Sequence, residues 1–287
     1  MTSLNLWEAF TKERGEVSRG MLGSQQLTVA YLLGFHLVNA ARSRLLIKRL
    51  QDRTDLAGYL KKGAKNASVT WYDLGCGTGA VAHAVTDFLL GAGLAPSALN
   101  IHLYDTSSSL LAAASRVLAE AGCGAAVKPH RVGLERLDSA MIPLAKGHEI
   151  HGISLGYVWN ELARNPQARS RIMRLMSEQA QGNTLLLLLE PASQPFARAA
   201  MELRDQLVDF GYQPLYPCIS NTPCPMLNLN RDWCYSEGTW QQPKIMQTLD
   251  KSIGISRSYL SGTLMAFASK SLYKQLHLTK PEAVVVG

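Results

Sequence analysis

The chain has 287 residues, of which 18% are charged and 47% are hydrophobic. A chain of this length can bury a core without disulfides or metal ions, and even its apolar run at 185–189 is far shorter than the roughly 20 residues of a membrane-spanning helix. The formal net charge of +7 favours an anionic partner, nucleic acid above all. Residues 1–8 include an acid and no basic stretch before an apolar block, so we expect no secretory signal and a cytoplasmic protein without a membrane partner.

Residues 1–66 are predicted to form a helical cap on the domain that follows, 67–287. Apolar residues recur at spacings of three and four between positions 24 and 42, which is typical of amphipathic helices. Further along, basic residues interrupt the apolar pattern and predict a positively charged helix face: Arg42, Arg44, Lys48 and Arg49. This face would either contact a phosphate backbone or be an ordinary solvated surface.

The sequence at 69–80 has the form of a strand, a tight loop and a helix. A run of β-branched and aromatic residues leads to Asp73, and glycines then occupy alternate positions at Gly75, Gly77 and Gly79. Because glycine has no Cβ, the backbone can turn sharply there and a ligand can lie against the main chain. Free N–H groups at the start of the helix add donors for the same ligand. We therefore expect a ligand-binding loop.

The letters D-L-G-C-G-T-G at 73–79 resemble the first motif of class I S-adenosylmethionine-dependent methyltransferases. The resemblance implies that S-adenosyl-L-methionine is the cofactor, and that Asp73 helps to hold the loop and the cofactor's ammonium end. The family's second motif matches Asp105, which ends the strand predicted at 99–105. Its carboxylate can accept hydrogen bonds from two ribose hydroxyls, and it can also cap the next helix. The resemblance further places Leu134 in the loop that contacts adenine and Tyr157 at the cofactor site.

Strand and helix signals alternate from position 69 in the order expected of parallel strands with crossover helices. The strands are predicted at 69–74, 99–105, 125–127, the first part of 148–162, 185–189, 212–217 and 263–269. We therefore predict an α/β fold with a doubly wound, seven-stranded, mostly parallel sheet of the Rossmann-like class I methyltransferase type. In that fold the seventh strand inserts antiparallel beside the sixth.

The carboxyl end of the fourth strand is the expected place for a methyl acceptor, because ligands of open α/β sheets bind at that edge. Asn160 could hydrogen-bond the acceptor and Glu161 could remove a proton from it. The open alternative is that both residues only stabilise the loop. An acceptor that is already nucleophilic needs alignment more than an acid or a base.

An insertion at about 217–258 contains Cys218, Cys224 and Cys234. In a reducing compartment these thiols are expected to be free, so their clustering suggests either a metal site or buried packing. Thiolates suit zinc or iron, although the spacing is not the C-x-x-C of common zinc sites.

A narrower resemblance rests on Y-V-W-N-E-L at 157–162, Glu190-Pro191, Arg198, Arg204 and the elements Cys-Pro and Asp-Trp-Cys in the insertion. These features resemble the methyltransferase family linked to the mitochondrial small ribosomal subunit and its bacterial relatives. The resemblance implies ribosomal RNA or the small ribosomal subunit as partner, and an iron–sulfur cluster with the three cysteines among its ligands. The expected function is methyl transfer to ribosomal RNA or in small-subunit assembly. Alternatives are a small-molecule or peptide methyltransferase, and an assembly factor that binds S-adenosylmethionine without turnover.

Overall fold

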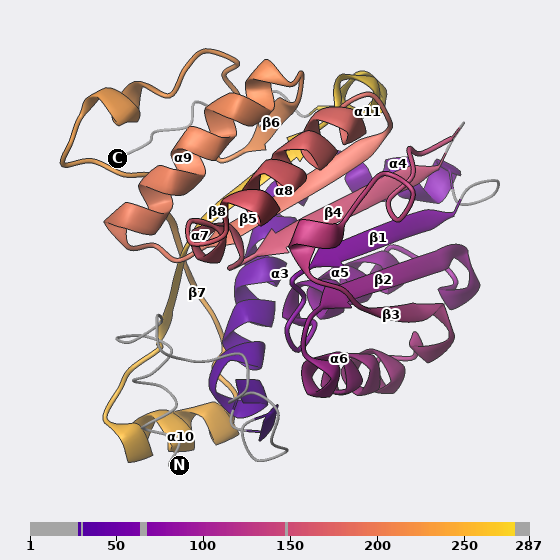
Figure 1. Cartoon of the computed structure of the whole chain (residues 1–287). Coiled ribbons are helices and arrows are strands. Elements are labelled where there is room, and N and C mark those ends of the chain that lie inside the picture. The colour runs from indigo at the N-terminus through magenta and orange to yellow at the C-terminus, as the bar shows by residue number, and fades with distance from the viewer. Residues whose placement is uncertain (1–27, 30, 64–67, 147–148, 279–287) are drawn as a thin grey trace.

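The computed structural model describes residues 28–29, 31–63, 68–146 and 149–278 (Figure 1). The strands are β1 Val69–Leu74, β2 Leu99–Asp105, β3 Val127–Arg131, β4 Ile150–Gly156, β5 Thr184–Glu190, β6 Gln213–Tyr216, β7 Ser236–Thr239 and β8 Tyr259–Ala268. The α-helices are α3 Leu37–Gln51, α4 Leu56–Gly63, α5 Ala80–Gly91, α6 Ser108–Glu120, α7 Trp159–Leu162, α8 Pro166–Gln179, α9 Gln194–Asp209, α10 Lys244–Ile253 and α11 Lys270–Gln275. A π-helix η2, Leu32–His36, precedes α3, and 3-10 turns are η3 Pro96–Ala98, η4 Gly124–Ala126, η5 Leu134–Arg136 and η6 Pro225–Asn228.

The sheet has the strand order β3-β2-β1-β4-β5-β8-β6, and β7 pairs with the first part of β8. The first five strands are mutually parallel, while β8 runs antiparallel to β5 and to β6. This is the predicted doubly wound sheet with its last long strand inserted antiparallel beside β6, so the predicted fold is confirmed. The short strand β7 was not predicted.

Helices cover both faces of the sheet, with α3, α5 and α6 on one face and α8 and α9 on the other (Figure 1). Strand β5 shows why two layers are needed. Leu185 and Leu187 belong to the core on the α3 and α5 side, whereas Leu186 and Leu188 belong to the core on the α8 and α9 side. Such a continuous apolar run is typical of a central strand buried on both faces.

The third strand lies later than predicted. Residues 124–126 form the turn η4, and β3 begins at Val127. The sequence signal was weak because Pro129 lacks a backbone N–H and small residues precede the strand. A proline is tolerated there because β3 is the edge strand of the sheet.

Helix α3 packs into the main core through Leu46, Ile47 and Leu50. The described part of the N-terminal segment therefore covers the sheet beside α5 instead of standing apart from it. The division into a cap at 1–66 and a domain at 67–287 stays a prediction, since residues 1–27 lie outside the described part. Among the described residues, no helix is long and apolar enough to span a membrane.

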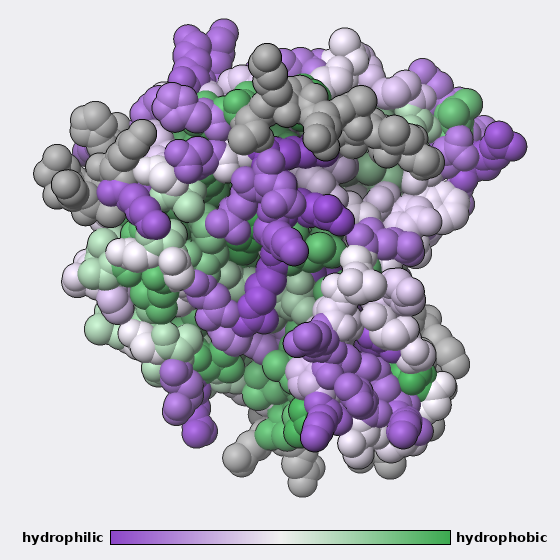
Figure 2. Space-filling view, turned by 180° about the vertical axis from the view of Figure 1, so that it is seen from behind, coloured by the Kyte–Doolittle hydropathy of each residue, from purple (hydrophilic) through white to green (hydrophobic). Residues whose placement is uncertain are grey.

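The insertion at 217–258 has two parts. Residues 217–235 run along α9, and the β7–β8 hairpin then carries α10 away from the sheet to the start of α3 (Figure 1). There, Met246 and Leu260 pack on Val38, while Arg257 pairs with Asp250 and donates to the carbonyl of Gly34. Viewed from the opposite side, the molecule has a notch between its upper body and the lobe that contains α10 (Figure 2).

Candidate functional site

The loop between β1 and α5 has the backbone geometry that its three glycines allow. Gly75, Gly77 and Gly79 have φ angles of +69°, +53° and +74°. A Cβ on Gly75 would lie 2.6 Å from Val158 Cγ2, and one on Gly79 would lie 2.9 Å from the Ala114 Cβ. A Cβ on Gly77 would make only ordinary van der Waals contact, with the Tyr31 hydroxyl nearest at 3.6 Å. Two glycines therefore permit close packing, whereas no tight contact closes off the backbone at Gly77, where a ligand could lie against the main chain.

Asp105 ends β2 beside Gly77. One carboxylate oxygen accepts from the N–H of Gly77 at 2.9 Å, and the other accepts from the N–H of Ser107 at 2.8 Å. Each oxygen keeps a further lone pair for a ligand hydroxyl. Ser107, not Asp105, is the N-cap of α6, because its hydroxyl accepts from Leu110 N. Burial raises the pKa of Asp105 above its usual range.

Asp73 lies behind the loop with 1% of its surface exposed. Its carboxylate accepts from the Ser154 hydroxyl at 2.7 Å and from Ala82 N at 3.2 Å, so it links β1, β4 and the start of α5. Trp71 Nε1 completes the contact by donating to the Ser154 hydroxyl at 2.9 Å. Burial raises the pKa of Asp73 to about 6. These contacts give Asp73 the role of holding the loop.

The turn after β4 carries the predicted acceptor residues. Tyr157 has a φ of +64°, an uncommon conformation for a non-glycine residue. Its N–H donates to the carbonyl of Leu189 at 2.6 Å, which ties the turn to β5. The half-buried Asn160 directs its amide nitrogen inward, and Glu161 lies exposed on α7. Strained backbone of this kind is often found at functional sites.

Glu190 is the residue that the sequence interpretation did not assign to the site. It ends β5 with 0% exposure and accepts from Trp159 N at 2.8 Å and from the side-chain amide of Asn160. Burial raises its pKa to about 7. An acid at the carboxyl end of a buried strand was the available signal, because that edge of the sheet binds ligands.

The N-terminal segment covers the loop from one side. His36, 4% exposed, contacts the Thr78 hydroxyl through Nδ1 at 3.1 Å and His83 through Nε2 at 3.2 Å. Burial is the largest cause that lowers the pKa of His36 to about 4, so it is neutral at pH 7. Arg42 places its guanidinium 5.9 Å from the centre of the Tyr157 ring. Nothing in the periodicity of this segment indicated these contacts.

Leu134 lies in the turn η5 and is half-buried. It packs against the core cluster that contains Tyr104 and Leu137. Two residues before it, Val132 donates its N–H to the carbonyl of Asp105 at 3.1 Å, which ties this segment to the end of β2. Its predicted contact with adenine stays a prediction.

The cysteine segment is not folded as a metal site. Among the described residues, no three His, Cys, Asp or Glu side chains form a group that could hold a metal ion, so the zinc or iron–sulfur site predicted at Cys218, Cys224 and Cys234 is not supported. All three thiols are free. Burial is the largest cause that raises the pKa of the Cys234 thiol to about 12, which disfavours a thiolate ligand there.

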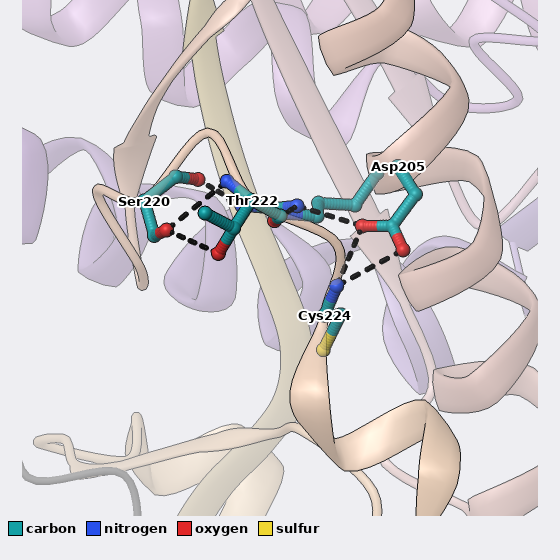
Figure 3. Close-up of polar contacts among 5 residues, drawn as sticks. Asp205, Ser220, Thr222 and Cys224 are labelled. Carbon is teal, nitrogen blue, oxygen red and sulfur yellow. Dashed lines mark hydrogen bonds and ion pairs between the residues drawn. The ribbon is translucent and has the colours of Figure 1, made fainter.

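Two arginines of α9 hold this segment by its backbone. Arg204, 3% exposed, donates to the carbonyls of Thr222, at 2.6 Å, and Ser220, and it pairs with Asp205. Asp205 in turn accepts from the N–H of Cys224 at 3.0 and 3.1 Å (Figure 3). Arg198 donates to four more carbonyls, those of Met226, Leu227, Leu229 and Asp232. A buried guanidinium thus organises the loop where a metal ion was expected.

The predicted basic face of α3 divides into two parts. Arg42 turns toward the site, and Arg44 forms an ion pair with Asp87. Lys48 and Arg49 are exposed. Of these four residues, only Lys48 and Arg49 are exposed and form no ion pair with another described residue.

Comparison with known proteins gives a likeness of fold. No family model and no curated protein matches the sequence. The cyclase SpnF is 15% identical over 79% of this chain and 80% of its own, with a TM-score of 0.41. Precorrin-6y C5,15-methyltransferase from Geobacter metallireducens GS-15 is 12% identical over 75% of this chain and 87% of its own, with a TM-score of 0.41. Geranyl diphosphate C-methyltransferase from Streptomyces coelicolor A3(2) is 14% identical over 88% of both chains, with a TM-score of 0.39. Values this low do not define a reaction, which has to be argued from the site.

Proposed function

We propose that this protein binds S-adenosyl-L-methionine at the β1–α5 loop and transfers its methyl group to a nucleophile held at the carboxyl ends of β4 and β5. The observation that carries the proposal is the backbone of Gly77 beside the Asp105 carboxylate. The loop bends at three positive φ angles, yet only at Gly77 would an added Cβ avoid a clash, with the Tyr31 hydroxyl nearest at 3.6 Å. An acid that grips this loop and keeps free lone pairs suits a ribose with two hydroxyls.

The residues of the site would divide the work between holding the cofactor and aligning the acceptor. Gly77 would let the backbone approach the methionine portion, Gly75 makes room for Val158, Asp105 would bind the ribose, and Asp73 would keep the loop in place. Bound S-adenosyl-L-methionine supplies an electrophilic methyl on sulfonium. The chain's part is to align a nucleophile with that methyl and to exclude water, which alone can lower a barrier substantially.

For the acceptor we propose ribosomal RNA or the small ribosomal subunit, in a cytoplasmic protein. The net charge of +7 supports an anionic partner, and the exposed side chains of Lys48 and Arg49 are free to contact phosphates.

The test is methyl transfer from methyl-tritiated S-adenosylmethionine to small-subunit ribosomal RNA transcribed in vitro and therefore unmethylated. The proposal expects label in the RNA and S-adenosylhomocysteine as the second product. Binding of the same RNA should weaken in the variant Lys48→Gln/Arg49→Gln, with a salt slope reduced by about 2. The matched control, Arg116→Gln/Lys128→Gln, removes the same charge from α6 and the edge strand β3 and should bind RNA as the parent does. Equal RNA binding by both variants would contradict the assignment of this surface.

A further inference from the structure

The turn 156–160 is fixed on three sides before any ligand arrives. Val158 packs under Gly75, where a Cβ would come within 2.6 Å of its Cγ2, so the turn is placed directly against the proposed cofactor loop. The N–H of Tyr157 binds the end of β5. On the third side, the fully buried Glu190 accepts from Trp159 N at 2.8 Å and from the side-chain amide of Asn160. Asn160 is therefore held beside the place that the methyl group would occupy.

The orientation of the Asn160 amide follows from its partners. Its nitrogen lies 3.2 Å from the carbonyl oxygen of Tyr157 and also contacts a carboxylate oxygen of Glu190. A carbonyl oxygen can only accept, so the NH2 group must face it, whatever the protonation of Glu190. The positive φ of Tyr157 belongs to the turn that brings this carbonyl into reach. Both N–H bonds of the amide are thus used inside the protein.

The other atom of the amide, Oδ1, accepts no hydrogen bond from any described residue in the structure, and Asn160 is only half-buried. Asn160 therefore offers a ligand a hydrogen-bond acceptor, its amide oxygen. An amide oxygen is not a base, so a hydroxyl acceptor, which must lose its proton to attack, would gain little from it. Attack from a ring carbon would need a nucleophilic cysteine, and the turn contains none. An amino group bears an N–H to donate and needs no prior loss of that proton.

We infer that Asn160 binds the N–H of an exocyclic amino group on a nucleobase, making this a nitrogen methyltransferase site, with Glu190 as the residue that positions the amide. The inference rests on the proposed function and specifies the chemical group that accepts the methyl. The amino nitrogen forms a bond to the methyl carbon while the carbon–sulfur bond breaks, and that electron pair stays on sulfur to give S-adenosylhomocysteine. The nitrogen then carries the positive charge and loses one proton to water. Asn160 would stabilise the developing charge through its hydrogen bond without accepting the proton.

Two variants test the roles separately. Asn160→Ala removes the amide oxygen that would accept the hydrogen bond from the substrate's amino group. Glu190→Gln keeps an oxygen for Trp159 N but presents an NH2 group to the NH2 of Asn160, so one of the two hydrogen bonds that orient the asparagine amide is replaced by a contact between two donors. Both variants should lower kcat by about 10- to 100-fold, with S-adenosylhomocysteine affinity within twofold of the parent. The double variant should be no slower than Asn160→Ala, since Glu190→Gln keeps the oxygen for Trp159 N and changes only the partner of the Asn160 amide. A purely structural role for Glu190 would make the two losses add.

The control is Asn165→Ala, which removes an asparagine side chain that caps α8 by accepting from Ala168 N at 3.1 Å. It should lose some thermal stability and keep its kcat. The assay uses the unmethylated small-subunit RNA transcript, nuclease digestion and mass spectrometry of the nucleosides. Methyl on an exocyclic amino nitrogen, lost in the two variants, supports the inference. Methyl on a ring carbon or a ribose oxygen, an unchanged kcat in Asn160→Ala, or no methylated base despite intact S-adenosylhomocysteine binding would overturn it. Absence of S-adenosylhomocysteine binding by the parent would instead refute the proposed function itself.

Discussion

Alanine at each loop glycine should separate folding from cofactor binding. Gly77→Ala places an L residue at a φ of +53°, which costs about 1–2 kcal/mol, but its Cβ meets no described atom closer than 3.6 Å. Gly75→Ala carries the same strain and also brings its Cβ to 2.6 Å from Val158 Cγ2. Overpacking of that kind adds about 1–3 kcal/mol, so the total loss should be about 2–5 kcal/mol. The stability of Gly77→Ala should therefore lie clearly above that of Gly75→Ala.

The affinity for S-adenosylhomocysteine should distinguish variants that lose similar amounts of stability. The matched control is Gly122→Ala, at a φ of +84° with no atom within 4 Å of the added Cβ, at the end of α6 away from the loop. Denaturant unfolding should give Gly77→Ala and Gly122→Ala similar losses of stability. Titration calorimetry with S-adenosylhomocysteine, at a temperature where all variants are folded, should show parent-like affinity for Gly122→Ala and at least about a tenfold loss for Gly77→Ala, about 1.4 kcal/mol. If Gly77→Ala bound as tightly as the control, the space beside Gly77 would not be the cofactor's.

Two further predictions concern groups away from the reacting atoms. Arg198→Met removes the donor to four carbonyls of the cysteine segment, so the free energy of unfolding should fall by roughly 2–4 kcal/mol. Limited proteolysis should then cut within 217–235. An unchanged cleavage pattern would contradict the role we give this arginine. Asp73 has a folded pKa raised from 3.8 to about 6, so its ionisation opposes folding: the penalty is absent below pH 4, grows as the pH rises to about 6, and then stays at about 3 kcal/mol. Relative to Asp73→Asn, the parent should lose that much stability between pH 4 and pH 7 in denaturant titrations. If the free energy of unfolding of the two proteins changed in the same way with pH, ionisation of Asp73 would not destabilise the folded protein.

Local backbone chemistry explains what the sequence predicted well. Three alternate glycines favour a turn with positive φ angles, and an apolar run such as 185–189 is typical of a central strand of a parallel sheet. The alternation of strands and helices placed Asp105 at the end of the second strand. Sequence spacing was sufficient for these features, because each depends on neighbours along the chain.

Long-range contacts were beyond the reach of such patterns. Glu190 meets Asn160 only because β4 and β5 pair and end together, and His36 reaches Thr78 only because the N-terminal segment folds back over the loop. The cysteines illustrate the opposite failure. Their spacing indicated a shared ligand, but the spacing of thiols does not reveal that Arg204 is buried among the backbone carbonyls of their loop.

A crystal structure of the protein with S-adenosylhomocysteine tests the central claim most directly. The account predicts the ribose hydroxyls within hydrogen-bond distance of the Asp105 carboxylate, the homocysteine chain against the backbone of Gly75 and Gly77, and the sulfur directed toward the turn that carries Asn160. A ligand bound elsewhere, or one bound at the loop with its ribose away from Asp105, would contradict the account.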